Sequence, residues 1–172
     1  MSSLNKNTLI KSLLFYLPVS FLFLSVLNEI DFNYLEIEYF SFNIAHILIF
    51  YWTLKSPRYL NYGSIFLAGL VNDVVVGLPI GVSSFCYLLI CAVTAYLRNI
   101  IITPNFINDW ISLLFTILLV NSIQVISLDF IFSIEVNYLR YMINSGFTFI
   151  FYPIFSFLFN ILEKKITTQK ND

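Results

Sequence analysis

Charge is scarce in this sequence. Lys, Arg, Asp and Glu together make up only 11% of the 172 residues, whereas about 25% is usual for a soluble domain. Histidine occurs once, at His46, and cysteine twice, at Cys86 and Cys91. A zinc site needs three or four ligands, and no cluster of Cys, His and carboxylates gathers around His46 in the sequence. We interpret the two cysteines as small buried apolar residues rather than as a disulfide or metal pair.

The sequence also lacks the short motifs of the common enzyme classes. It contains no HExxH, GxSxG, phosphate-binding loop or GxGxxG, and no pair of carboxylates is placed for acid–base chemistry. It has no basic tail or stripe of the kind that binds nucleic acid. We therefore expect no enzymatic activity, no cofactor, no metal and no nucleic-acid partner.

Apolar residues, by contrast, make up 59% of the chain. A chain of this size has no core large enough to bury so much apolar surface, so lipid must act as its solvent. The sequence predicts an all-α membrane bundle of six transmembrane helices in a single domain, residues 1–172. Some segments fall below the 17–25 residues of a typical span, and a shallow re-entrant pair of the third and fourth stays open. The predicted spans are 9–27, 39–54, 60–76, 82–97, 110–128 and 138–162.

The few charges are distributed unevenly between the connections. If the N-terminus is cytoplasmic, eight of the nine basic residues fall on the cytoplasmic side and only Arg140 falls outside. The outer connections then carry the acidic residues. This distribution satisfies the positive-inside rule with an even number of spans, and it predicts a multi-pass protein of the bacterial inner membrane with both termini in the cytoplasm. The outer acidic residues are Glu29, Asp31, Glu36, Glu38, Asp129 and Glu135.

One carboxylate lies inside the apolar region. Asp73 is the only acidic residue between Glu38 and Asp109, and a charge at the bilayer centre costs about 2.5–3.5 kcal/mol on insertion scales. The following run from Gly77 to Gly81, Gly-Leu-Pro-Ile-Gly, predicts a tight outer turn. The small-xxx-small spacing of its glycines favours close backbone packing beneath the turn. Asp73 would accept N–H bonds from that turn, contact a partner, or take part in ligand or proton chemistry.

Polar residues recur at helical spacing in two other spans. Asn43 and His46 are three residues apart, as are Asn121 and Gln124, so each pair is predicted to share a helix face. Such groups commonly form hydrogen bonds between membrane helices. The alternative is that they line a polar cavity for a small ligand or an ion.

The order of residues in the centre of the chain resembles the family of the rod shape-determining protein MreD. Members are small inner-membrane proteins with an aromatic-containing span, a proline after a basic residue, then G-L-x-x-D and G-x-x-x-G with an internal proline. The hydropathy outline covers the whole chain and the motif covers residues 52–96. The matching residues, with the adjacent Arg58, are Trp52, Pro57, Gly69, Leu70, Asp73, Gly77, Pro79 and Gly81.

This resemblance implies a non-catalytic scaffold subunit of the cell-elongation machinery that makes peptidoglycan and sets rod shape. The implied partners are membrane lipid, a bitopic protein like MreC and, through it, MreB and the wall synthases. The six-helix outline is also similar to the substrate-binding subunits of energy-coupling-factor vitamin transporters. That alternative predicts a small molecule bound among Asn43, His46, Asn121 and Gln124.

Overall fold

The computed structural model describes residues 6–27, 41–100 and 105–171, and these residues form helices and turns without a strand. The all-α prediction is therefore confirmed for the described chain. In order, the elements are α1 (Lys6–Leu27), α2 (Ile44–Lys55), the 3-10 turn η2 (Pro57–Tyr59), α3 (Tyr62–Val76), α4 (Val82–Ile100), α5 (Phe106–Ile126), the π-helical turn η3 (Ser127–Ile131) and α6 (Tyr138–Asn171).

Each predicted apolar segment corresponds to one helix, with differences at the ends. The segment predicted from residue 39 becomes helical only at Ile44, because the Asn43 side chain caps α2 by accepting a hydrogen bond from the His46 N–H at 3.2 Å. The last helix does not end near residue 162 but continues to Asn171. The acidic residues predicted for the first outer connection, from Glu29 to Glu38, lie outside the described residues.

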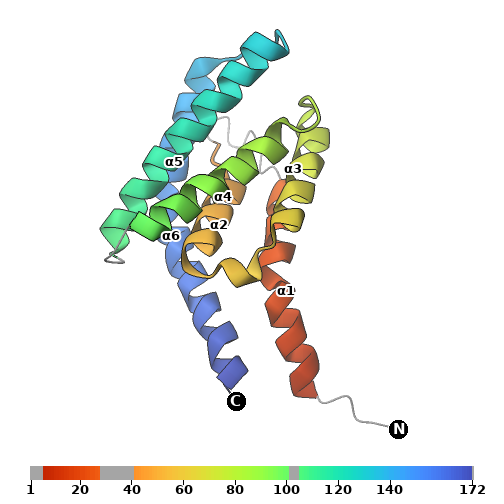
Figure 1. Ribbon diagram of the computed structural model, residues 1–172, viewed down its shortest axis with the longest axis vertical. Coiled ribbons are helices and arrows are strands. Elements are labelled where there is room, and N and C mark those ends of the chain that lie inside the picture. Colours follow the sequence, from red (N-terminus) through yellow and green to blue (C-terminus); the bar gives the residue numbers. More distant parts are fainter. Residues whose placement is uncertain (1–5, 28–40, 101–104, 172) are drawn as a thin grey trace.

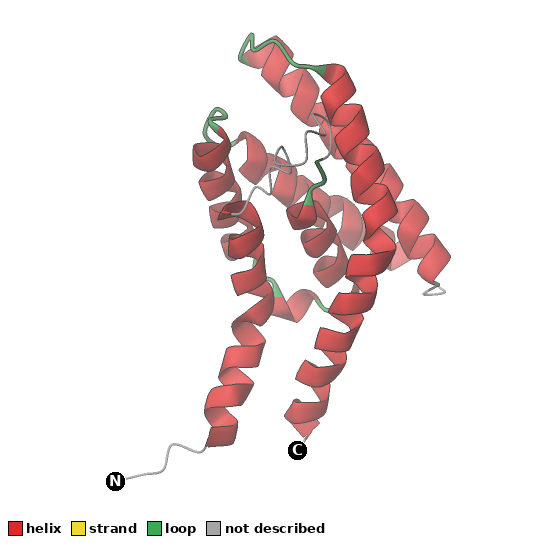
Figure 2. Ribbon diagram, turned by 180° about the vertical axis from the view of Figure 1, so that it is seen from behind, coloured by secondary structure: helices red, strands yellow, loops and turns green. Residues whose placement is uncertain are grey.

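The helices alternate in direction along the long axis of the molecule (Figure 1). The beginning of α1 and the end of α6 lie at the same end, which Figure 2 shows from behind. We call this the basic end, because Lys55 at the end of α2, Arg58 in η2 and Arg98 in the last turn of α4 lie toward it. The α3–α4 turn and the α5–α6 connection lie at the other end, which we call the acidic end for its Asp129 and Glu135.

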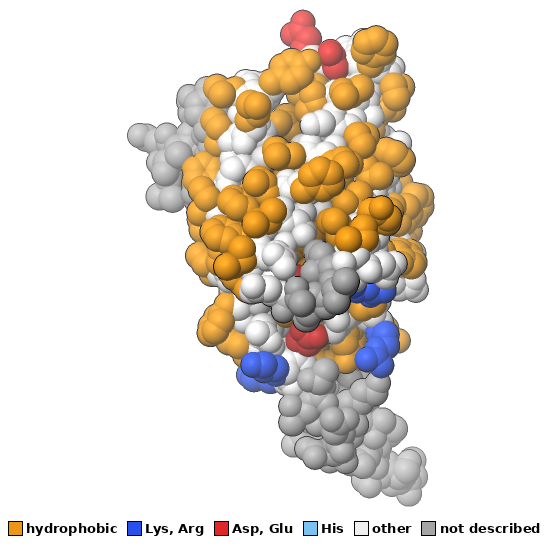
Figure 3. Space-filling model, turned by 60° about the vertical axis from the view of Figure 1, so that its left-hand side comes forward, with side chains coloured by type: hydrophobic (Ala, Val, Ile, Leu, Met, Phe, Trp, Pro, Cys, Tyr) orange, Lys and Arg blue, Asp and Glu red, His pale blue; other side chains and the backbone are white. Residues whose placement is uncertain are grey.

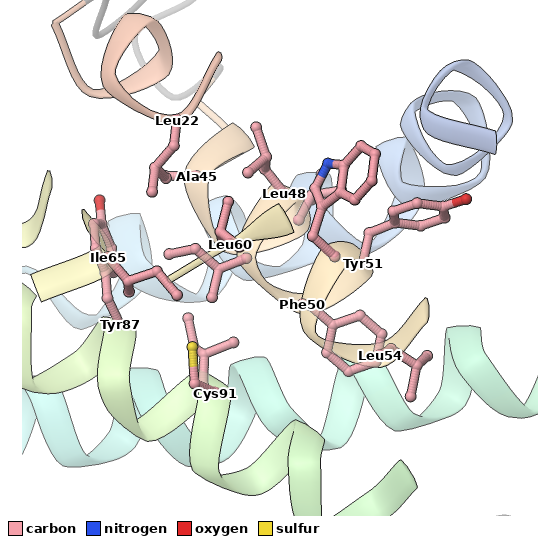
Figure 4. Packing of buried hydrophobic residues seen from close by; sticks show 14 of the residues in the cluster. Leu22, Ala45, Leu48, Phe50, Tyr51, Leu54, Leu60, Ile65, Tyr87 and Cys91 are labelled. Atoms are coloured by element: carbon pink, nitrogen blue, oxygen red, sulfur yellow. The ribbon is translucent and has the colours of Figure 1, made fainter. Parts of the chain in front are cut away.

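The core of the bundle is built around α2. All ten residues from Ala45 to Leu54 are buried, as expected for a helix that is apolar on every side. α2 packs against α1, α4, α5 and α6, and Figure 4 shows side chains from several helices, such as Leu22, Ile65 and Cys91, converging on it. Cys86 and Cys91 are both free and buried, which confirms their interpretation as core residues.

The outer surface of the bundle is largely apolar. Many large side chains are exposed, including Phe130 (87%) and Ile80 (75%). In Figure 3 hydrophobic side chains cover the middle of one face, acidic groups lie at the acidic end, and Lys and Arg lie toward the other end with a further acidic group between them. A soluble monomer rarely exposes so continuous an apolar surface, so this surface is suited to contact with lipid.

Three of the described helices are long and apolar enough to cross a membrane: Val82–Ile100, Phe106–Ile131 and Tyr138–Ile166. Three further apolar helices are shorter, at Phe15–Leu27, Ile44–Lys55 and Tyr62–Val76. By length and composition, the structure therefore supports a membrane protein with three long spans.

Candidate functional site

The turn between α3 and α4 is the first part of the candidate site. Gly77 ends α3 in the left-handed conformation, with φ of 76°, which an L side chain adopts only with strain. Its N–H and that of Leu78, the latter at 2.9 Å, donate to the Asp73 carbonyl oxygen. Gly81, with φ of 103°, lets the chain turn into the beginning of α4. Both glycines are thus required by the path of the turn.

The carboxylate of Asp73 holds this turn from beneath. Its side chain is completely buried. Oδ2 accepts the Gly81 N–H at 2.7 Å and Oδ1 accepts the Ser83 N–H at 2.8 Å. Charged acceptors make the stronger hydrogen bonds, and a negative charge is favoured at a helix N-terminus, here that of α4. The sequence-based expectation that Asp73 accepts N–H groups from the turn agrees with these two bonds.

Close helix packing occurs elsewhere than the sequence suggests. The expectation placed it at Gly77 and Gly81, but a Cβ atom added at either would meet nothing within 4 Å. A Cβ at Gly69 would instead lie 2.3 Å from the Ser84 Cα. The Ser84 hydroxyl donates to the Phe66 carbonyl at 2.9 Å across the same contact. Gly69 is therefore the glycine that lets α3 and α4 approach, and the prediction for the other two was wrong.

Three of the remaining motif residues do not join this turn. Trp52 is buried in the core, with its ring centroid 5.6 Å from that of Tyr59. Pro57 begins η2, and Arg58 beside it is exposed. These residues lie toward the basic end, whereas the turn from Gly77 to Gly81 lies at the acidic end. The motif read in the sequence is therefore divided between two ends of the bundle, with Pro79 inside the turn.

The second part of the candidate site is a cavity of about 390 Å³ toward the acidic end. Asn43, His46, Asn121 and Gln124, the four residues singled out from the sequence, all line it. Asn43 and His46 do so as the cap and first turn of α2, not as two positions on one helix face as predicted. The other lining residues are Ser25, Ser41, Phe42, Ile44, Ala45, Asn72, Val76, Leu78, Tyr87, Arg140, Tyr141 and Asn144.

Several of the lining amides are fixed by neighbouring helices. The Asn121 Nδ2 donates to the Ser145 Oγ at 2.7 Å, and the Asn144 Nδ2 donates to the Ser41 Oγ at 3.0 Å. The Asn72 Nδ2 donates to the Ser83 Oγ at 2.9 Å, which connects the cavity wall to the Asp73 turn. Leu78, from the turn itself, also lines the cavity. The turn and the cavity are therefore one continuous structural unit.

A third polar group, at the basic end, was not found from the sequence. Lys55 pairs with the buried Asp109 at 2.6 Å. Glu163 accepts hydrogen bonds from the Tyr51 hydroxyl, at 3.0 Å, and from the Ser56 hydroxyl. These contacts tie the end of α2 to α5 and α6 over more than fifty positions of sequence, and no local pattern predicts such long-range pairing.

Metal binding receives no support from the described side chains. No group of three or more His, Cys, Asp and Glu lies close enough within the described ranges to hold a metal ion. The arrangement offers amides, hydroxyls, one imidazole and one guanidinium around a cavity. Such a set can bind and orient a polar molecule.

The fold and the surface define the class: an all-helical membrane protein whose polar groups gather at the two ends of its central helix. The sequence matches the model of the family described as rod shape-determining protein MreD over residues 9–162. The chain therefore belongs to the MreD family, and the resemblance seen in its central motif is confirmed. Comparison with curated proteins and with solved structures found no significant match.

Proposed function

We propose that the chain is a non-catalytic scaffold subunit of the machinery that elongates the cell wall in the inner membrane of rod-shaped bacteria. Membership of a family of rod shape-determining membrane proteins, over residues 9–162, carries this proposal. The proposed direct partner is a bitopic protein like MreC, which connects the subunit to MreB and the wall synthases. The whole chain, residues 1–172, acts as one membrane domain.

The proposed topology has six spans with both termini in the cytoplasm. The start of α1 and the end of α6 at the same end of the molecule support an even number of crossings. The basic residues at that end support a cytoplasmic location through the positive-inside rule. The short helices α2 and α3, of 12 and 15 residues, would then both cross. α2 would cross at the buried centre of the bundle, and α3 at its surface, where Tyr62 and Val74 are exposed.

Single reporter cysteines test this topology. Glu135→Cys at the acidic end and Arg58→Cys at the basic end are both at exposed positions, and the two native cysteines are buried. A membrane-impermeant maleimide applied to intact spheroplasts should label Glu135→Cys at once and Arg58→Cys only after permeabilisation. The opposite order, or labelling of both before permeabilisation, would overturn the proposed orientation.

We propose that the motif residues serve the scaffold by shaping the bundle. Asp73 has no exposed surface, so its carboxylate would act on a partner through the turn that it holds. Gly69, Gly77, Pro79 and Gly81 would act with it, at the acidic end. Trp52, Pro57 and Arg58 would shape the α2–α3 connection at the other end, where Arg58 is exposed.

The first experiment is a pull-down of the tagged protein from its own cells in mild detergent, read by mass spectrometry. Recovery of the bitopic partner and the wall synthases is the expected result. Asp73→Asn should reduce that recovery and disturb cell shape, while Asp129→Asn, a matched change of an exposed carboxylate at the same end, should not. Normal shape and full recovery with Asp73→Asn would contradict the assigned role of the turn.

The same experiment separates the alternative, a substrate-binding subunit of a vitamin transporter. The observation that favours it is the cavity lined by Asn43, His46, Asn121 and Gln124. Recovery of ATP-binding transport subunits in place of wall synthases would support it. Family membership supports the scaffold, and we therefore place the transporter second.

A further inference from the structure

The cavity toward the acidic end has the size of a ligand site. Its volume of about 390 Å³ lies within the range of about 300–1,000 Å³ that is typical of small-molecule pockets. All six α-helices, the segment before α2 and the α3–α4 turn contribute to its wall. Because its residues come from the acidic ends of these helices, it lies near one surface of the proposed membrane region.

Two side chains in this wall have a polar group without a hydrogen-bond partner within the described part of the chain. His46 is 4% exposed, and its Nδ1 atom makes no hydrogen bond to any described residue. The Gln124 side chain, 9% exposed, also makes no side-chain hydrogen bond to a described residue. Buried polar groups are paired in the great majority of cases. A ligand in the cavity would supply partners for both, which the packing of the bundle does not.

The charge of the wall indicates the sign of the ligand. Among its lining residues the only charged side chain is Arg140, which is exposed at the rim of the cavity. No described salt bridge includes Arg140, and no Asp or Glu of residues 6–27, 41–100 and 105–171 lines the cavity. Among the described lining residues a cation would find no carboxylate, whereas a phosphate would find a guanidinium, whose planar fork matches its oxygens.

We propose that this cavity binds a phosphate ester that carries hydroxyl groups, with the phosphate at Arg140 and the hydroxyls at His46 and Gln124. The site goes beyond the scaffold function, which does not require a ligand. Two sources carry this chemistry: the headgroup of an anionic lipid, which enters from the outer leaflet, and a water-soluble phosphorylated polyol, which enters from outside the cell. The lining amides Asn43 and Asn121 extend the hydrogen-bonding wall around the hydroxyls.

Binding is tested with two probes on the full chain. Phosphatidylglycerol, against phosphatidylcholine as the zwitterionic control, is added to the protein in detergent and scored by native mass spectrometry and thermal stability. Glycerol 3-phosphate represents the soluble source. Retention and stabilisation by phosphatidylglycerol alone would identify a lipid site. Stabilisation by glycerol 3-phosphate would identify a soluble ligand site. No preference for either probe over phosphatidylcholine would overturn the proposal.

Variants locate the bound probe. Gln124→Leu keeps the volume of the side chain and removes its amide, and Ser122→Leu makes the same new side chain at an exposed position two residues away on α5. Arg140→Gln removes the charge at the rim, and Arg98→Gln, at an exposed position in the last turn of α4, is its control at the basic end. We expect each cavity variant to weaken probe binding roughly tenfold, since hydrogen bonds to charged or buried groups are of this order.

The two control variants should bind as the original protein does. Arg140 is exposed, so its replacement leaves the bundle folded and keeps the test valid if Gln124→Leu does not fold. Equal binding by the Arg140→Gln variant and the original chain would place the probe elsewhere and refute the proposal. The pull-down of wall synthases is scored in parallel, so failure of the cavity proposal and failure of the scaffold proposal are separate results.

Discussion

Replacement of Asp73 by Asn removes one charge while it changes the side-chain volume very little. In the structure both carboxylate oxygens accept backbone N–H groups, one from Gly81 and one from Ser83, and the side chain is completely buried. An Asn side chain has only one acceptor oxygen. Its NH2 group would therefore face one of the two N–H donors, and that donor would lose its partner.

The magnitude follows from these contacts. A hydrogen bond to a charged group contributes about 1.5–3 kcal/mol, and an unsatisfied buried donor costs about 1–3 kcal/mol. Because these two contributions describe partly the same lost contact, we expect Asp73→Asn to lower the free energy of unfolding by about 3 kcal/mol. For a chain of this length each kcal/mol corresponds to about 2–4 °C in Tm, so the expected decrease is about 6–12 °C.

The assay is thermal unfolding of the purified protein in detergent, followed by intrinsic tryptophan fluorescence. Trp52 is buried in the core and reports on its opening. Asp129→Asn is the control, because Asp129 is exposed and its carboxylate accepts one hydrogen bond, from the hydroxyl of the exposed Tyr138, at 3.1 Å. A Tm for Asp73→Asn within about 2 °C of the original protein and of this control would refute the reasoning about the turn.

Three further changes test other contacts by the same assay. Gly69→Ala should lower stability by about 1–3 kcal/mol through overpacking, whereas Gly63→Ala, whose Cβ would meet only one atom at 4.0 Å, should not; equal effects would contradict the close approach. Gly77→Ala should cost about 1 kcal/mol, because φ is 76° there and the space around it is open; an unchanged Tm would argue against the left-handed conformation. Lys55→Gln leaves the buried Asp109 without its cation and should lower the free energy of unfolding by about 1–3 kcal/mol. The double variant Lys55→Gln with Asp109→Asn should recover part of that loss. If the effects of the two single changes simply add in the double variant, that result would argue against the ion pair.

The positions of the helices could be predicted from the sequence because lipid imposes a simple rule. Every backbone group must be satisfied within the apolar region, so each apolar segment forms a helix, and all six segments match helices. The end of each helix depends on local detail that hydropathy does not carry. Asn43 is an example. Its spacing from His46 predicts that both residues share a helix face, whereas in the structure Asn43 precedes α2 and caps it.

Contacts between distant helices were the part that the sequence could not supply. The four cavity residues are predicted to lie together because they are polar in apolar surroundings, and the structure brings them together. Their neighbours in the cavity wall, Arg140 and Asn72, are not part of that prediction. Gly69 was noted only as part of a motif, since its approach to Ser84 depends on how α4 packs. Glu163 directly follows the apolar run predicted at 138–162 and is not singled out by its sequence, although it accepts hydrogen bonds from residues more than 100 positions away.

The shortness of α2 has an electrical consequence. Its 12 residues rise about 18 Å at 1.5 Å each, whereas the hydrocarbon layer is about 30 Å thick. In the proposed topology polar groups fill the difference at both ends, the cavity on one side and the Lys55, Asp109 and Glu163 group on the other. The insulating part of the protein is then thinner than the bilayer around it, and the transmembrane voltage falls over a shorter distance there. Charges at the two ends of α2 would experience a steeper field than the same charges in a bundle built from full-length helices.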